Sequence, residues 1–460
     1  MKCCEMSVCP SYSHTNLRHI TLKFTFLLTV TAMNITHPIH WFRHCAPYIN
    51  THRGKTFVLM FDDSALSDPN FATLVQDIAL LHSLGIRLVL VHGSRLQIDK
   101  SLALAGEATH FYGDVRITPP HLMPHIVGAV GAVRFAIEAQ FSKGLANTPL
   151  FGAKISTVSG NFISARPFGV RDGIDYQQTG EVRRVETGAI SHNLASGHIV
   201  IIGSVGFSAT GELFNMQAID VATAVATALT ADKLILFSEE DGIYSGGQLV
   251  REITLQDGET LYQTDPTPAL KNALTACRQG VKRIHLLSHK KDGALIEELF
   301  TTDGCGTMLS QNPFDHIRPA TTDDIVGIES LIRPLEQQGI LIARSRQRLE
   351  EELGFFYVIE RDGKIIGCSA LYPLNPDSGE IASIAIDPDY RSGQRGLDLL
   401  TFIEQKAKSL GFNKLFALTT RTLHWFIENG FMQVEPSALP DERRKRYHNG
   451  RNSKVLLKQL

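Results

Sequence analysis

Two arginines and two glycines stand together where a predicted strand meets a predicted helix. The segment Arg391-Ser-Gly-Gln-Arg-Gly396 follows a strand with isoleucines at positions 381, 384 and 386, and a helical apolar face begins at Leu397. The first turn of a helix presents unpaired backbone N–H groups and the positive end of the helix dipole. The segment therefore predicts a seat for phosphate oxygens, although such a connection also uses glycine without binding anything.

This segment resembles the acetyl-CoA-binding segment of the GNAT acetyltransferases, whose pattern is Arg/Gln-x-x-Gly-x-Gly/Ala. Arg391 and Gly396 match the pattern, and Gln394 replaces its middle glycine. The resemblance implies acetyl-CoA as the co-substrate. It places the contacts with that molecule at Ile384, Ile386, Arg391, Ser392, Gly393, Gln394, Arg395 and Gly396.

Glu380 lies on the same predicted strand, shortly before the turn. Acetyl transfer from a thioester to an amine needs a base for the ammonium proton, donors for the tetrahedral oxyanion and an acid for the leaving thiolate. The position of Glu380 predicts a carboxylate near the thioester end of the cofactor. An ordinary exposed acid on a strand is the alternative.

The composition limits the class of protein. The 460 residues exceed one ordinary core and predict two or three domains. With 43% hydrophobic and 20% charged residues, the chain is typical of a globular protein. Its 45 basic side chains nearly balance 47 acidic ones, so we expect neither nucleic acid nor a membrane as a partner. The basic run from Arg443 to Arg446 is interpreted as a solvated face.

The seven cysteines lack the paired spacing of zinc ligands. We therefore expect free thiols in a reducing compartment, the cytoplasm, and no bound metal. The first 33 residues contain a mildly apolar run, Ile20 to Ala32, which a lysine and four threonines interrupt. This run predicts a disordered leader or a start-site extension rather than a secretory signal. No other stretch is expected to be long and apolar enough to cross a membrane.

Strands and helices alternate from residue 40 to about residue 300. A short helix over residues 40–50 carries Trp41, Phe42, Cys45 and Tyr48 on roughly one face, which is either a packed edge or a subunit contact. After it, predicted strands alternate with helices, and a hairpin-like region intervenes at 154–185. The strands are expected at 56–61, 87–94, 198–203, 233–237 and 283–287, and the helices at 70–84, 95–105, 128–141, 220–230 and 268–280, with a last one ending near 300. This alternation predicts a parallel sheet with a ligand site at the carboxyl ends of its strands.

This region resembles the amino-acid kinase fold, and in particular N-acetylglutamate kinase. The resemblance rests on five blocks of sequence: Val91-His92-Gly93, Thr179 to Val182, Asn215 with Asp220, Gly280 to His285, and Gly304-x-Gly-Thr-Met308. It implies a single large α/β domain with the fold of those kinases.

The residues that transfer phosphate in that family are replaced in this chain. Its members carry a lysine on the first strand, followed by glycines, whereas Met60 and Asp62-Asp63 stand at these positions here. Phosphoryl transfer depends on positive charge around the migrating group, and two carboxylates would repel that group. The region is interpreted as a kinase fold without kinase activity.

A fold that has lost its reaction can serve as a sensor. The arginine-inhibited N-acetylglutamate kinases bind arginine with a tyrosine on an N-terminal helix and with a histidine and a glutamate near the last strand. The resemblance assigns these roles to Tyr48, His285 and Glu298 and implies L-arginine as an effector. Taken singly, each residue is also typical of a surface acid or a core histidine.

A second α/β pattern follows a polar, proline-containing linker at residues 311–316. Thr321 or Thr322 is expected to cap a helix that reaches about Ile332, and further strands and helices are expected at 355–372, 414–419, 424–429 and 454–457. The predicted fold class is therefore α/β. An amino-acid-kinase-like, parallel-rich sandwich at 34–310 precedes a smaller mixed α/β GNAT domain at 317–460.

The whole chain is similar to the bacterial N-acetylglutamate synthases, which join an amino-acid kinase domain to a GNAT domain. The resemblance implies Glu380 as the general base, Thr419 as the general acid, and Arg344 and Arg451 as the clamps for the two carboxylates of L-glutamate. It also implies regulation by L-arginine and a homo-oligomer such as a hexameric ring. Two other functions stay open: an active N-acetylglutamate kinase fused to an acetyltransferase, and a non-catalytic sensor of arginine and acetyl-CoA.

Overall fold

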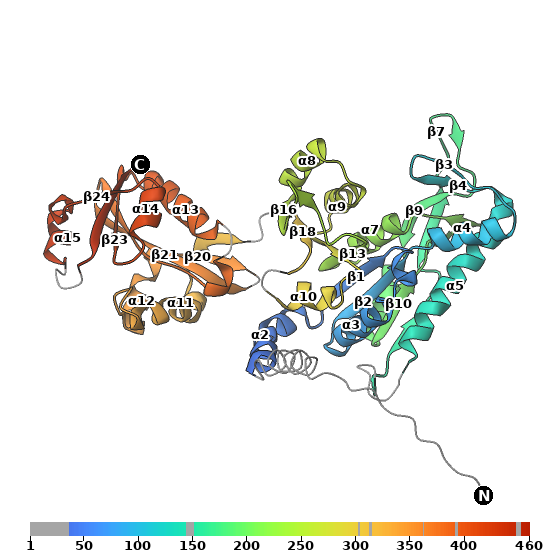
Figure 1. Ribbon diagram of the computed structural model, residues 1–460, viewed down its shortest axis with the longest axis horizontal. Coiled ribbons are helices and arrows are strands. Elements are labelled where there is room, and N and C mark those ends of the chain that lie inside the picture. The colour runs from blue at the N-terminus through green and yellow to red at the C-terminus, as the bar shows by residue number, and fades with distance from the viewer. Residues whose placement is uncertain are drawn as a thin grey trace, which may run out of the picture. The chain divides into compact units, whose positions relative to one another are not determined.

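The computed structural model describes residues 36–143, 151–301, 304–311, 315–361, 363–391, 394–447 and 452–460 (Figure 1). Residues up to Arg53 and residues from Gly54 onward form two compact units. In the first unit, helix α2 spans Thr36–His52, with Trp41 and Phe42 exposed and Cys45 buried. The helix predicted over 40–50 is present and longer. The expectation for the leader lies outside the described residues.

Eight strands of the second unit form one sheet, in the order β16-β18-β17-β13-β1-β2-β10-β5. All neighbours in this order run parallel except β17 and β18. The strands are β1 (Thr56–Phe61), β2 (Arg87–His92), β5 (Ser156–Val158), β10 (His198–Ile202), β13 (Lys233–Ser238), β16 (Glu252–Thr254), β17 (Arg283–Ser288) and β18 (Thr307–Ser310). The predicted parallel-rich sheet is confirmed.

Helices cover both faces of this sheet (Figure 1). They are α3 (Phe71–Ser83), α4 (Arg95–Leu104), α5 (Met123–Phe141), α6 (Thr187–Ala195), α7 (Ala218–Ala228), α8 (Leu255–Thr264), α9 (Pro268–Arg278) and α10 (Ala294–Phe300). Strand β1 shows why both faces are covered. Val58 packs in the core cluster with α6, α7 and α9, whereas the ring of Phe61 meets that of Phe71 in α3 at 5.7 Å. Successive side chains of a strand point to opposite faces, so this apolar run needs a helix on each side.

A smaller sheet stands where the sequence predicts a hairpin-like region. Its order is β12-β11-β6-β9, with β6 (Ile163–Pro167), β9 (Gly180–Val185), β11 (Val205–Phe207) and β12 (Leu213–Asn215). Among the described residues of this region there are also three hairpins: β3 (His110–Tyr112) with β4 (Val115–Ile117), β7 (Val170–Arg171) with β8 (Ile174–Asp175), and β14 (Tyr244–Ser245) with β15 (Gln248–Leu249).

One apolar helix corrects an expectation from the sequence. Residues Pro120–Phe141, which include α5, are long and apolar enough to cross a membrane by length and composition alone. In the structure this helix is a core helix, because Ile126 and Val130 pack into a buried cluster with Ile98 and Leu102 of α4. The sequence does not distinguish such a core helix from a membrane span.

Seven strands that lie between residues 316 and 459 form a second sheet, in the order β19-β20-β21-β22-β23-β25-β24. Its strands are β19 (His316–Pro319), β20 (Phe356–Arg361), β21 (Lys364–Asn375), β22 (Ser378–Ile386), β23 (Lys414–Thr419), β24 (Met432–Val434) and β25 (Lys454–Gln459). All neighbours are antiparallel except β22 and β23, which run parallel.

The helices of this region lie on the two faces of the seven-stranded sheet (Figure 1). Helices α11 (Ile325–Gln337) and α12 (Arg346–Glu352) share one core cluster, and α13 (Arg395–Ser409) with α14 (Leu423–Glu428) shares the other. Thr321 and Asp324 form a capping box ahead of α11, which confirms Thr321 as the cap. The short helices α12 and α15 (Asp441–Lys445) and the strand β24 were not predicted.

Candidate active site

Strands β22 and β23 pair along only part of their length. The register joins Ser378–Ile381 to Lys414–Ala417, and the last pair is Ile381 with Ala417. Strand β22 nevertheless continues to Ile386 and β23 to Thr419. The two strands therefore separate after Ile381, and the backbone groups of β22 that face the gap are available to an elongated ligand.

A distorted residue marks the point where β22 leaves its neighbour. Ser383 has a φ of 53°, in the left-handed region that non-glycine residues rarely adopt, and the register with β21 shifts between Cys368 and Ala370. Its buried hydroxyl has no hydrogen-bond partner among the described residues. Bulges and strained residues of this kind concentrate at functional sites.

The predicted phosphate turn lies directly beyond β22. Ile384 and Ile386 are half-buried against the core, and Arg391 is exposed, with its Nε 3.4 Å from the carbonyl oxygen of Ile386. Gln394 precedes the first residue of α13, whose N-terminus opens the turn. A Cβ on Gly396 would meet only Trp425, at 3.5 Å. Ser392 and Gly393, also predicted to bind the cofactor, lie outside the described residues.

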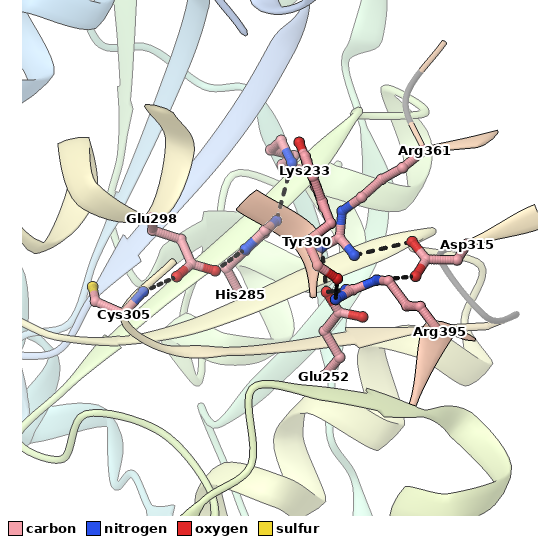
Figure 2. Close-up of polar contacts among 9 residues, drawn as sticks. All are labelled: Lys233, Glu252, His285, Glu298, Cys305, Asp315, Arg361, Tyr390 and Arg395. Carbon is pink, nitrogen blue, oxygen red and sulfur yellow. Dashed lines mark hydrogen bonds and ion pairs between the residues drawn. The ribbon is translucent and has the colours of Figure 1, made fainter. Parts of the chain in front are cut away.

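Arg395 does not point freely into this turn. Its Nε donates to Asp315 over 2.6 Å and its Nη1 donates to the carbonyl of Tyr390 over 3.3 Å. Figure 2 shows Asp315 held between Arg395 and Arg361, beside Glu252 of β16. Arg395 thus ties the start of α13 to Asp315, a residue of the predicted linker.

Glu380 is buried in β22, one residue before the last pair with β23. Both of its carboxylate oxygens accept hydrogen bonds from Arg443 of α15: Nη2 donates over 3.0 Å, and Nε donates to the other oxygen. These bonds raise the pKa of Arg443. The interpretation of Arg443 to Arg446 as a solvated face is therefore wrong for Arg443, whereas Arg444 and Lys445 are exposed and pair within α15.

Thr419 ends β23 on the other side of the gap. Its Oγ1 accepts the backbone N–H groups of Arg421 and Thr422, over 3.2 and 2.9 Å, and lies 2.8 Å from the hydroxyl of Thr422. Two donated hydrogen bonds stabilise negative charge on this oxygen. The threonine can therefore give up its own proton to a group that lies in the gap.

Arg344, in the segment before α12, lies on the face of the sheet that carries Glu380. Its Nε lies 3.3 Å from Glu352, which also accepts a 2.6 Å hydrogen bond from the hydroxyl of Tyr372. Tyr372 stands opposite Glu380 in the antiparallel register, so both side chains project from one face. The structure thus connects Arg344 to the strand pair that carries Glu380. Arg451, the other predicted clamp, lies outside the described residues.

The predicted effector residues His285 and Glu298 form a buried pair in the region of the eight-stranded sheet (Figure 2). Nδ1 of His285 lies 2.6 Å from Glu298, whose second oxygen accepts the N–H groups of Cys305 and Gly306. Nζ of Lys233 donates to Nε2 of His285 over 3.1 Å. Because the ammonium can only donate, a neutral His285 carries its proton on Nδ1 and gives that hydrogen bond to Glu298.

The electrostatics agree with this arrangement. Burial and the nearby Lys233 lower the pKa of His285. Burial would raise the pKa of Glu298, but the hydrogen bonds from His285, Gly306 and Cys305 outweigh it and bring that pKa to about 2. The pair therefore consists of a neutral imidazole and a carboxylate, with side chains only 4% and 5% exposed. Tyr48, the third predicted effector residue, is half-buried in α2 of the first unit.

A cavity of about 210 Å³ remains at the carboxyl ends of β1 and β2, lined by Met60, Asp62 and Asp63 among others. Asp63 accepts the N–H of Leu96 at the N-terminus of α4, and Asp62 accepts from Ser64 and Ala65. In a phosphate site the N–H groups at a helix N-terminus bind phosphate oxygens, whereas at the N-terminus of α4 the carboxylate of Asp63 accepts such an N–H group. This arrangement supports the interpretation of a kinase fold without phosphoryl transfer.

Among the described residues, no group of three or more His, Cys, Asp or Glu side chains gathers to hold a metal ion. Within the seven-stranded region, the structure adds Arg443, Tyr372, Glu352 and Ser383 to the residues expected from sequence. The sequence of α15 does not indicate that Arg443, rather than Arg444, contacts Glu380. The pairing of Tyr372 with Glu380 follows from the strand register, which the sequence alone leaves undefined.

Comparison with known proteins divides the chain in the same way. Residues 55–288 match the amino acid kinase family, and residues 325–431 match the acetyltransferase (GNAT) family. The amino-acid acetyltransferase of Azotobacter vinelandii is 49% identical over 428 residues, covering 92% of this chain and 99% of that protein. The amino-acid acetyltransferase of Ectopseudomonas mendocina is 48% identical over the same shares.

Two solved structures of N-acetylglutamate synthase from Neisseria gonorrhoeae also resemble the chain, each over 92% of this chain and 99% of that protein. The complex with coenzyme A and L-arginine has a TM-score of 0.83 at 37% identity. The complex with coenzyme A and N-acetyl-glutamate has a TM-score of 0.59 at 38% identity.

Proposed function

Because the chain belongs to the N-acetylglutamate synthase family of amino-acid acetyltransferases, we propose that it acetylates the α-amino group of L-glutamate with acetyl-CoA. The product is N-acetyl-L-glutamate, whose formation opens L-arginine biosynthesis. The observation that carries this proposal is the buried carboxylate of Glu380 beside the gap between β22 and β23, with Thr419 across that gap. An active kinase fused to the acetyltransferase and a non-catalytic sensor are less consistent with these groups.

Glu380 and Thr419 supply the two proton transfers that this reaction needs. Glu380 takes one proton from the α-ammonium and passes it to solvent. The amine nitrogen then attacks the thioester carbonyl, and its second proton passes to the ionised Glu380 as the C–N bond forms. When the C–S bond breaks, Thr419 donates a proton to the thiolate, which leaves as CoA, and the second proton from Glu380 returns through solvent to the threonine oxygen. Backbone N–H groups of the bulged strand β22 would stabilise the oxyanion.

Acetyl-CoA would bind along the gap, with its pyrophosphate on the turn before α13. The N-terminus of a helix favours phosphate oxygens, and Arg391 adds a positive charge near the start of α13. The contacts would come from Ile384 and Ile386 and from residues 391–396, with Ser392 and Gly393 among them. Gln394 replaces a glycine of the family pattern, so its side chain would lie next to the phosphates.

The second substrate is a dicarboxylate, and two arginines are assigned to it. Arg344 is the candidate for one carboxylate because Glu352 and Tyr372 fix its position on the face that carries Glu380. Arg451 is the candidate for the other carboxylate, on the strength of the family resemblance. A planar guanidinium binds a carboxylate through two parallel hydrogen bonds, so a dicarboxylate would be selected over a monocarboxylate.

L-Arginine would act on the region of the eight-stranded sheet. The gonococcal relative was solved in complex with coenzyme A and L-arginine and in complex with coenzyme A and N-acetyl-glutamate. An effector controls activity only if it binds two states with different affinity. We assign Tyr48, His285 and Glu298 to the arginine site, and the exposed Trp41 and Phe42 of α2 to a contact in a homo-oligomer.

Acceptor selectivity tests the proposed reaction. Thiol release from acetyl-CoA would be measured with L-glutamate, L-aspartate and L-glutamine as acceptors. We expect L-glutamate to give the highest kcat/KM, because it alone places two carboxylates and the amine at the assigned spacing. Equal rates with all three acceptors would contradict the assignment of the dicarboxylate site.

A further inference from the structure

Two carboxylates in the cavity at the carboxyl ends of β1 and β2 have unused hydrogen-bonding capacity. One oxygen of Asp62 accepts from Ser64 and Ala65, and one oxygen of Asp63 accepts from the N–H of Leu96. Among the described residues, the second oxygen of each carboxylate has no hydrogen-bond partner, and neither carboxylate pairs with a lysine or an arginine. Two neighbouring carboxylates in this condition attract a positively charged group.

A basic group lines the same cavity from the hairpin β3–β4, which lies beside the start of α4 (Figure 1). The guanidinium carbons of Arg95 and Arg116 lie 4.4 and 4.5 Å from the centre of the Phe111 ring. Arg116 pairs with Asp99 over 2.6 Å, whereas Arg95 has no hydrogen bond or ion pair within the described part of the chain. The guanidinium fork of Arg95 is therefore available to a carboxylate.

Two buried polar residues also line the cavity. Ser204 is 4% exposed, and its hydroxyl has no hydrogen-bond partner in the part of the chain that the structure describes. Asn215 is 7% exposed and donates from Nδ2 to Thr118 over 3.1 Å, which leaves its amide oxygen as an acceptor. Buried polar atoms normally have partners, so these two atoms indicate a place for a polar ligand.

We propose that this cavity binds a free α-amino acid with a neutral, apolar side chain. Its carboxylate binds to Arg95 and its ammonium to Asp62 and Asp63. A zwitterion satisfies the acidic and the basic groups at the same time and brings no net charge into the cavity. This inference does not rest on the proposed function, because none of these residues lies in the acetyltransferase region.

The size and the walls of the cavity limit the ligand further. Its volume of about 210 Å³ is below the ~300–1,000 Å³ of pockets for drug-sized molecules, which favours an amino acid over a nucleotide. Met60, Ile98 and Met216 provide apolar contacts for the side chain of such a ligand. An N-acylated amino acid has no cation for Asp62 and Asp63, and these carboxylates would repel a phosphate.

Two analogues of L-leucine test which charges the cavity recognises. 3-Methylbutylamine lacks the carboxylate, and N-acetyl-L-leucine lacks the ammonium. In calorimetric titrations of the full-length protein, we expect L-leucine to bind about tenfold or more tightly than either analogue, the effect of a charge-assisted hydrogen bond. Equal affinity for L-leucine and N-acetyl-L-leucine, or no binding of L-leucine, would overturn the proposal.

Variants locate the bound amino acid. Arg95→Gln and Asp62→Asn each remove one charge, and the asparagine keeps an oxygen for the donors of the turn after β1. Each should weaken L-leucine binding by about ten- to a hundredfold. Arg184→Gln is the matched control, because Arg184 is exposed in β9 and does not line the cavity. Thermal unfolding would show that each variant folds.

The other two amino-acid sites give the contrary outcome. If L-leucine binds to Arg95→Gln as tightly as to Arg184→Gln, the cavity is not its site. If its binding is lost instead in Arg344→Gln or in His285→Asn, L-leucine occupies the acceptor site or the effector site, and the proposal fails. Neither result changes the test of the acetyl transfer, which is measured with L-glutamate.

Discussion

Glu380 is buried in β22, and both of its carboxylate oxygens accept hydrogen bonds from Arg443. In the proposed reaction this carboxylate accepts a proton from the ammonium group of the substrate. The side chain is therefore fixed by the strand register on one side and by α15 on the other. Its function depends on its charge, which an isosteric amide removes.

Glu380→Gln should lower kcat by about 10²- to 10⁴-fold, the usual contribution of a positioned general base. The amide cannot accept the ammonium proton, although one of its atoms still accepts a hydrogen bond from Arg443. The KM for acetyl-CoA should change little, because the phosphate turn lies beyond the end of β22. Steady-state kinetics measure both effects, and a kcat within a few-fold of the wild type would exclude Glu380 as the base.

Thr419→Val should lower kcat, because the isosteric side chain has no proton to donate. It should also destabilise the fold by about 1–3 kcal/mol, since the N–H groups of Arg421 and Thr422 lose their acceptor. Thr419→Ser keeps the hydroxyl and serves as the control, with near wild-type kcat. The acid role fails if Thr419→Val, once shown to be folded, turns over as fast as Thr419→Ser.

At this scale the sequence predicts the residues of the reaction but not their partners. Glu380 and Thr419 could be assigned because the family pattern fixes their place relative to the phosphate turn. Arg443 could not, because it lies among four consecutive basic residues whose contacts depend on how α15 packs. Arg344 was expected to bind substrate, and its bond to Glu352 arises from tertiary contacts that no local pattern records.

At the scale of elements, the turn Gly304–Gly306 is built around the carboxylate of Glu298. A Cβ on Gly304, which has a φ of 60°, would lie 2.4 Å from that carboxylate. Glycine is therefore needed at position 304 both because the Glu298 carboxylate approaches its backbone closely and because its φ is positive. Helix α10, which carries Glu298, is joined in this way to β17 through His285 and to the turn before β18.

The region of the eight-stranded sheet, which contains the His285–Glu298 pair, should become less stable as the pH falls. Burial lowers the pKa of His285 in the folded protein, so the neutral imidazole contributes to folding stability above about pH 6.5, its pKa in the unfolded chain. This contribution is lost as the pH falls below that value. The pKa of Glu298 is about 2 in the fold and about 4.3 when unfolded, so its contribution is lost as the pH drops below about 4.3 towards 2. Both effects lower the unfolding midpoint in acid.

His285→Asn should flatten the dependence of the unfolding midpoint on pH between 7 and 5, because the amide donates to Glu298 but does not titrate. Differential scanning calorimetry over that range measures the effect. His192, an exposed histidine of α6, provides the matched control as His192→Asn. Identical pH profiles for His285→Asn and the wild type would show that the imidazole is not held neutral in the fold.

The elements themselves were largely predictable. Long apolar runs and glycine stops located β1, β2, β10, β13 and β17 together with α3, α7 and α9, because hydrophobic period and helix termination are local signals. The short parallel strands β5 and β16 were not predicted. The short elements α12, α15 and β24 were missed because their few residues carry no period of their own. Packing against the sheet, rather than local preference, forms such pieces.

At the scale of the whole molecule, charged groups link the region of the eight-stranded sheet to the start of α13. Glu252 of β16 pairs with Arg361 and lies 3.8 Å from Arg395, and both arginines also pair with Asp315 (Figure 2). Arg395 is the first residue of the helix that opens the phosphate turn. A change in the region of β16 could therefore reach the acetyl-CoA site through this group of side chains.

Glu252→Gln should weaken the response to L-arginine, with a several-fold higher concentration needed for half-maximal effect and an unchanged kcat without arginine. The charge of Glu252 is what couples it to Arg361 and Arg395. Glu259→Gln is the matched control, because Glu259 pairs with Arg278 within the region of the eight-stranded sheet. An arginine titration of both variants measures the effect. Equal sensitivity in Glu252→Gln and Glu259→Gln would rule out this route.

The two-part architecture followed from resemblance to two families, and both parts are confirmed by their sheets and by the family matches. The ion pairs between Glu252 and the arginines could not be predicted, because they join residues more than a hundred positions apart. Such contacts depend on the tertiary structure alone.

The proposed reaction is tested most directly by incubating the protein with acetyl-CoA and L-glutamate and identifying the product by mass spectrometry, with and without L-arginine. We expect N-acetyl-L-glutamate and free CoA in equal amounts, at a rate that L-arginine changes. Acetyl-CoA that remains intact in the presence of L-glutamate, or an acetylated product that forms equally well from other amines, would contradict it.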